Sequence, residues 1–167
     1  SGNTRVFVDT CSLMEEASGI FLEQHLVPLV TQHSTPLIVA YEVVRELDRL
    51  ANSQKSSTAK AARNAKRVVQ SMRDQGAAVV VGDPGDSFPD NLFQRVFTGY
   101  RLKYRLILIS QDRKLVKDIL ELNNSASVDR IHGIDAYRIG NHGDPMKWSL
   151  DPSHDSGVKY SMPSSGD

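Results

Sequence analysis

Short apolar runs alternate along the chain with longer segments in which apolar residues recur at helical spacing. The short runs are rich in β-branched and aromatic residues and are bounded by polar or turn-forming residues, a pattern typical of strands. They predict strands at residues 5–8, 37–40, 77–81 and 106–109, and a weaker fifth strand within residues 131–139. The helical spacing predicts helices at residues 17–30, 41–50, 59–73, 90–104 and 114–122.

The alternation of these elements predicts the fold class. Strands that are continuously apolar, each followed by a helix, are typical of a parallel sheet covered by helices on both faces. The sequence therefore predicts an α/β domain over residues 4–140. From Asn141 onward the periodicity is lost and Gly, Pro, Ser and Asp accumulate, so residues 141–167 are expected to form an irregular tail or linker.

Composition narrows the function classes only slightly. The 167 residues are 40% hydrophobic and 24% charged, with 20 basic and 20 acidic residues, so net charge indicates no particular partner. Cys11 is the only cysteine, which excludes an internal disulfide and a thiolate metal cluster and favours an intracellular location, in the cytoplasm or, in a eukaryote, the nucleus. No apolar run approaches the roughly 20 residues that cross a bilayer, so no membrane partner is expected.

Acidic residues follow the predicted strands. Asp9 comes directly after the first strand, and Asp112 follows the fourth strand after two polar residues. Glu46 lies at the boundary of an apolar helix face, and Asp90 opens the helix after the third strand. Ligands of open α/β sheets bind beyond the carboxyl ends of the strands, so these four carboxylates are expected to converge there.

Four converging carboxylates repel one another, and a hard divalent cation relieves that repulsion. Mg²⁺ and Mn²⁺ prefer carboxylate and water ligands, and such ions support phosphodiester hydrolysis. The simpler alternative is that Asp9, Asp90 and Asp112 only cap helices and that Glu46 only pairs with a neighbouring arginine.

Four motifs around these acids resemble the PIN domain family of metal-dependent ribonucleases, over residues 5–140. They are VFVDT at 6–10, VVRELDRL at 43–50, PDNLFQRV at 89–96 and LISQDRKL at 108–115. The resemblance implies that Asp9, Glu46, Asp90 and Asp112 are the catalytic, metal-binding acids and that Ser110 is the hydroxyl residue before the last acid, beside the substrate. Asp83, Asp86 and Asp90 share one loop, and Asp90 is preferred as the third acid because it directly precedes the apolar helix pattern. Asp118 is an additional, weaker candidate.

The same resemblance implies a three-layer α/β/α sandwich with a mostly parallel central sheet. The implied activity is an Mg²⁺- or Mn²⁺-dependent endoribonuclease that cuts single-stranded RNA and leaves 5′-phosphate and 3′-hydroxyl ends. Two alternatives remain: a catalytically silent PIN-like scaffold that binds RNA or protein, and a flap-type nuclease acting on DNA. Further expected partners are a regulatory or inhibitory protein, or additional domains of a larger chain.

Basic and aromatic residues complete the candidate set. Between residues 51 and 73 there is no acid, and four basic residues recur at helical spacing: Lys60, Arg63, Lys66 and Arg67. They are expected to contact RNA phosphates, or else to form an ordinary solvated helix face. Arg113 and Lys114 follow Asp112 and are weaker phosphate candidates. Trp148 is expected either to stack on a base or to anchor the tail to the domain.

Overall fold

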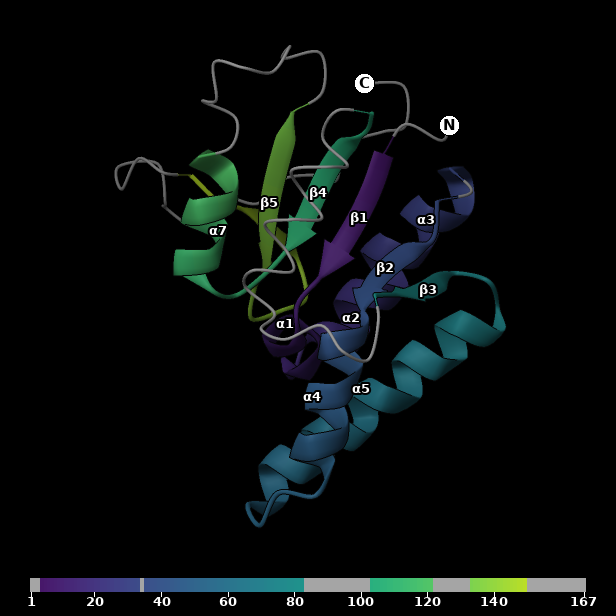
Figure 1. Ribbon diagram of the computed structural model, residues 1–167, viewed down its shortest axis with the longest axis vertical. Coiled ribbons are helices and arrows are strands. Elements are labelled where there is room, and N and C mark those ends of the chain that lie inside the picture. Colours follow the sequence, from purple (N-terminus) through teal and green to yellow (C-terminus); the bar gives the residue numbers. More distant parts are fainter. Residues whose placement is uncertain (1–3, 34, 83–102, 122–132, 150–167) are drawn as a thin grey trace.

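A six-stranded sheet forms the centre of the protein (Figure 1). The computed structural model describes residues 4–33, 35–82, 103–121 and 133–149. The strands are ordered β3-β2-β1-β4-β5-β6 across the sheet. Their bounds are β1 Thr4–Val8, β2 Leu37–Ala40, β3 Ala78–Val81, β4 Arg105–Ile109, β5 Ile134–Ile139 and β6 Pro145–Lys147.

The first five strands run parallel to one another, and only β6 pairs antiparallel, with β5. All four residues of β2 are buried, as are Leu106–Ile109 in β4, because helices cover these central strands on both faces. The edge strand β3 is more open, with Val79 40% exposed. The α/β prediction with a mostly parallel central sheet is confirmed.

Helices follow the strands as crossover connections. Their bounds are α1 Thr10–Met14, α2 Ser18–Phe21, η1 Leu22–Leu26, α3 Val27–His33, α4 Tyr41–Ala51, α5 Ser56–Asp74 and α7 Arg113–Leu120. From β1 the chain moves to β2 on one side of the sheet, whereas from β4 it moves to β5 on the other side. Crossovers between parallel strands are almost always right-handed, so crossovers that leave β1 and β4 in opposite directions are expected to place α7 on the face opposite to α1–α3.

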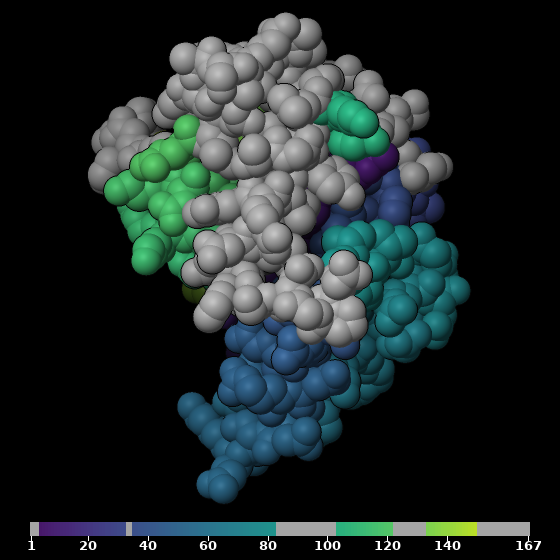
Figure 2. All heavy atoms as spheres, viewed as in Figure 1, coloured from purple at the N-terminus to yellow at the C-terminus, as the bar shows by residue number. Residues whose placement is uncertain are grey.

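The helical hairpin formed by α4 and α5 projects beyond the carboxyl ends of the strands (Figure 1). In the space-filling view its atoms form the lower end of the molecule (Figure 2). Its two helices pack along their length through small and apolar residues, among them Leu47, Ala59 and Ala62, which are buried. Within the part of the chain that the structure describes, no helix is long and apolar enough to cross a membrane.

The observed elements differ from the predicted ones in three places. Helix α1 at Thr10–Met14 forms where no helix was predicted. The single helix predicted at residues 17–30 is a run of α2, a π-helical turn η1 and α3. The irregular chain predicted from residue 141 is wrong at Pro145–Lys147, where β6 forms at the sheet edge. Three residues are too few to show an alternating pattern, so only the pairing with β5 defines this strand. The helix predicted at residues 90–104 lies largely outside the described residues.

Candidate active site

The site lies at the carboxyl ends of β1 and β4, which are neighbours in the sheet. From β1 the chain continues to one side of the sheet, and from β4 it continues to the other side. Since β1 lies between β2 and β4, its carboxyl end and that of β4 flank the topological switch point. The register pairs Val8 with Ile109, and the Asp9 amide donates to the Ile109 carbonyl at 3.1 Å. The residues that follow these two strands are therefore held side by side.

Asp9 is a buried carboxylate, only 7% exposed. It is the N-cap of α1, and its Oδ1 accepts a hydrogen bond from the Ser12 amide at 2.8 Å. Its Oδ2 accepts a hydrogen bond from the Ser110 hydroxyl, across a sequence separation of 101 residues. Burial raises the pKa of Asp9, hydrogen bonds from Ser110 and Ser12 oppose that rise, and the negative charge of Asp112 adds to it.

Ser110 links Asp9 to Asp112. The Ser110 side chain is fully buried, and its Oγ accepts a hydrogen bond from the Asp112 amide at 3.0 Å while its hydroxyl donates to Asp9. Asp112 is the N-cap of α7, where its Oδ1 accepts from the amides of Lys114 and Leu115 at 3.0 and 3.2 Å. Asp112 therefore caps a helix and also lies close enough to Asp9 to act on it electrostatically.

Glu46 reaches this region from α4. Its Oε2 accepts a hydrogen bond from the Thr10 hydroxyl at 2.9 Å, so it lies against the turn that carries Asp9. Its side chain is 35% exposed, and Arg49 lies 3.9 Å from its Oε1. The predicted interaction of Glu46 with a neighbouring arginine therefore exists, but it accompanies the contact with Thr10 rather than replacing it.

The exposed Cys11 lies within electrostatic range of the three described acids and of Glu15. Burial of part of the thiol raises the pKa of Cys11, and the charges of Asp9, Glu46 and Asp112 raise it further, in that order. All three carboxylates thus act on one thiol. Among the described residues, no group of three or more His, Cys, Asp or Glu side chains is placed so that it could hold a metal ion. The predicted third acid, Asp90, and its alternatives Asp83 and Asp86 lie outside the described residues.

The arrangement of acids at this edge agrees with the comparison to known families. The sequence model of the PIN domain family matches residues 6–127. The chain belongs to the PIN domain family. That match spans β1 through α7 and so includes every described strand end that carries a candidate acid.

A solved structure with the same PIN fold is that of the PIN domain endonuclease Utp24. It superimposes with a TM-score of 0.51 and 16% sequence identity, covering 83% of this chain and 86% of the other. At this level of identity the likeness shows the fold alone. In a search of curated protein sequences, nothing matches this chain.

One acid of this PIN domain was not predicted from the sequence. Glu42, in the first turn of α4, is buried to 9% exposure and pairs with Arg45 at 3.2 Å. Its position two residues after β2, at the carboxyl edge of the sheet, is the signal that could have identified it. Glu46, the predicted residue, is the more exposed of the two but is the one that contacts the Asp9 turn.

The predicted RNA-binding residues lie on the exposed side of α5, and three of them have partners there. Lys66 Nζ lies 2.7 Å from Asp48 Oδ1 on α4, and Arg63 donates to the Ala51 carbonyl at 3.2 Å. Arg67 donates to the Asn64 side chain at 2.6 Å within its own helix. Arg63 and Lys66 therefore connect the two helices of the hairpin, and their contact with RNA stays a prediction.

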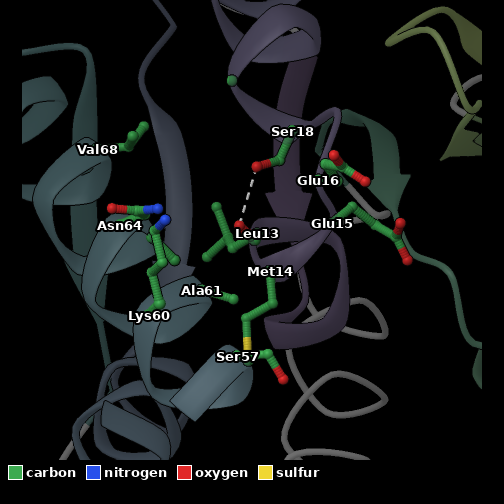
Figure 3. Close-up of a pocket in the computed structure, with 12 residues that line it drawn as sticks. Leu13, Met14, Glu15, Glu16, Ser18, Ser57, Lys60, Ala61, Asn64 and Val68 are labelled. Carbon is green, nitrogen blue, oxygen red and sulfur yellow. Dashed lines mark hydrogen bonds between the residues drawn. The ribbon is translucent and has the colours of Figure 1, made fainter.

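Lys60, the fourth predicted residue, lines a groove of about 600 Å³ between α5 and the segment that follows β1. Figure 3 shows Lys60 and Asn64 on the α5 side, facing Leu13 and Met14, with Glu15 and Glu16 farther along the opposite wall. The Ser18 hydroxyl donates to the Leu13 carbonyl at 3.0 Å and closes the turn between α1 and α2. Acidic and basic residues both line this groove, so its charge alone does not favour a nucleic acid.

Proposed function

We propose that this PIN domain is an Mg²⁺- or Mn²⁺-dependent endoribonuclease that cuts single-stranded RNA at the carboxyl edge of the sheet. The observation that carries the proposal is the buried Asp9 carboxylate, joined through the Ser110 hydroxyl to Asp112 at the switch point between β1 and β4. The reaction class is supported by Utp24, a PIN domain endonuclease that shares this fold.

The donor set suits a hard divalent ion. Burial raises the pKa of Asp9, and its described hydrogen bonds come from neutral donors rather than from a cationic side chain. A cation placed between Asp9 and Asp112 would stabilise both charges, and carboxylate oxygens are the ligands that Mg²⁺ and Mn²⁺ prefer. Such an ion would supply an activated water and stabilise charge on the phosphoryl oxygen.

The chain's own residues have separate roles in this proposal. Asp9 and Asp112 would hold the ion, and Ser110 would position both through its two hydrogen bonds. Glu46, oriented by Thr10, supplies a further carboxylate, and Asp90 is the proposed third acid. The exposed basic residues on α5 are proposed to attract RNA phosphates without sequence preference: Lys60, Arg63, Lys66 and Arg67.

Cleavage of a labelled single-stranded RNA by the wild type and by Asp112→Asn tests the proposal. Asparagine is as good an N-cap as aspartate, so the variant keeps α7 capped while it removes a charged ligand. We expect metal-dependent cleavage by the wild type and a large loss in the variant. The control is Asp74→Asn at the exposed end of α5, where Asp74 accepts a hydrogen bond from Gln70, and it should cleave normally.

Two results would contradict the proposal. Equal cleavage by the wild type and Asp112→Asn would show that Asp112 is not a metal ligand required for cleavage. Absence of both cleavage and Mn²⁺ binding, the latter measured by calorimetry, would instead favour a catalytically silent binding domain.

A further inference from the structure

A second pocket lies between α7, the helix that Asp112 caps, and the segment after β6. It has a volume of about 410 Å³ and is lined by Arg113, Val116, Lys117, Glu121, Trp148 and Ser149. This volume falls within the roughly 300–1,000 Å³ range of small-molecule sites. Two of the lining side chains are cationic, one is aromatic and one is acidic.

The aromatic wall of this pocket is held in place by two hydrogen bonds. The Trp148 indole Nε1 donates to the Ser110 carbonyl at 2.8 Å, and the Trp148 amide donates to the Ala136 carbonyl at 2.9 Å. The side chain is only partly buried. Trp148 therefore anchors the segment after β6, as one of its two predicted roles required, and its ring is oriented before any ligand arrives.

Positive charge surrounds the ring. The guanidinium carbon of Arg113 lies 5.9 Å from the centre of the ring, and that of Arg138 lies 6.0 Å from it. Lys117, one turn along α7, is exposed and lines the same pocket. The single carboxylate in the lining, Glu121, leaves the pocket with more positive than negative side chains.

We propose that this pocket binds one nucleotide of the RNA strand next to the bond that is cut. Aromatic side chains stack on bases regardless of their identity, and cationic side chains bind the phosphates on either side. The base would lie against Trp148, with an adjoining phosphate at Arg113 and Lys117. The pocket adjoins the candidate acids through two residues. The Trp148 indole donates to the Ser110 carbonyl, and Arg113 directly follows Asp112 in the chain. This inference rests on the proposed function for its substrate.

Trp148 is the only tryptophan of the chain, so its fluorescence reports on this pocket alone. We would titrate the protein with a short oligouridine in EDTA, where binding is measured without cleavage. Saturable quenching of Trp148 is expected. Lys117→Ala should weaken binding about threefold and reduce the slope of log K against log salt concentration by about 0.7, the value for one single-strand phosphate contact.

The matched control is Lys103→Ala, an exposed lysine that precedes β4 at the amino end of the strands. It should leave both the affinity and the salt slope unchanged. An abasic oligomer of the same length should bind more weakly and quench less. Quenching by the abasic oligomer equal to that by oligouridine would overturn the stacking of a base on Trp148.

Cleavage kinetics separate this inference from the proposed function. If the pocket binds RNA, Lys117→Ala should raise KM more than it lowers kcat. Normal cleavage without a fluorescence change, and with an unaltered KM in Lys117→Ala, would overturn the nucleotide pocket and leave the endonuclease intact. Saturable, Lys117-dependent quenching without cleavage would support the pocket and contradict the proposed activity.

Discussion

Replacing Ser110 with alanine removes the group that links the two central acids. The hydroxyl donates to the Asp9 carboxylate and accepts from the Asp112 amide, and the residue is fully buried, so water does not replace it. A hydrogen bond to a charged group contributes about 1.5–3 kcal/mol and a neutral one about 1 kcal/mol. Ser110→Ala should therefore lower the free energy of unfolding by about 3 kcal/mol.

The measurement is urea denaturation in EDTA, with Ser18→Ala as the matched control. The Ser18 hydroxyl makes one neutral hydrogen bond, to the Leu13 carbonyl, so its loss should cost about 1 kcal/mol. A loss in Ser110→Ala no greater than that in Ser18→Ala would refute the linking role of Ser110.

The effect of Ser110→Ala should also depend on pH. Burial raises the pKa of Asp9, so folding favours the protonated form of this carboxyl relative to the unfolded chain. The stability that this contributes is fully present below the unfolded pKa of about 3.9 and is lost as pH rises through the folded pKa. Since Ser110 lowers the pKa of Asp9, its removal raises that pKa further and increases the loss. The difference between the wild type and the variant should therefore be larger at neutral pH than in acid, and a pH-independent difference would contradict the reasoning.

Three further predictions concern the turn near β6, the metal and α4. Gly143→Ala should destabilise the protein by about 1–3 kcal/mol more than Gly76→Ala in urea denaturation. Both glycines have positive φ, but only at Gly143 would an added Cβ lie 2.7 Å from the Ile20 side chain. Equal losses of stability would show that the Ile20 side chain moves aside. Mg²⁺ or Mn²⁺ at about 100 times its Kd should stabilise the wild type by about 2.7 kcal/mol in thermal unfolding but not Asp9→Asn, and an equal shift in both would remove Asp9 from the metal site. Glu46→Gln should lower the cleavage rate by about tenfold or more, whereas Glu42→Gln should chiefly lower stability, and the reverse result in the same two assays would assign Glu42 to the site.

Local sequence patterns determined most of the secondary structure. The β-branched runs place the strands to within a few residues, since a buried strand needs continuous apolar residues whatever its partner. Asp9 and Asp112 were identified because each follows such a run, and both are also the N-caps that their positions predicted. Membership of the PIN domain family was likewise readable from the order of the acidic motifs.

Tertiary structure decided what those residues do together. The order of strands places β1 beside β4, and only this pairing brings Ser110 to Asp9 across 101 residues. The same holds for β6 and Trp148, because a three-residue edge strand exists only through its partner β5. The sequence spacing of the lysines and arginines on α5 is the same whether their side chains are solvated or paired. The contact of Lys66 with Asp48 depends on how α4 and α5 pack together. Sequence periodicity reports on burial along one element, whereas hydrogen bonds and charge pairs between elements depend on distances that only the folded chain defines.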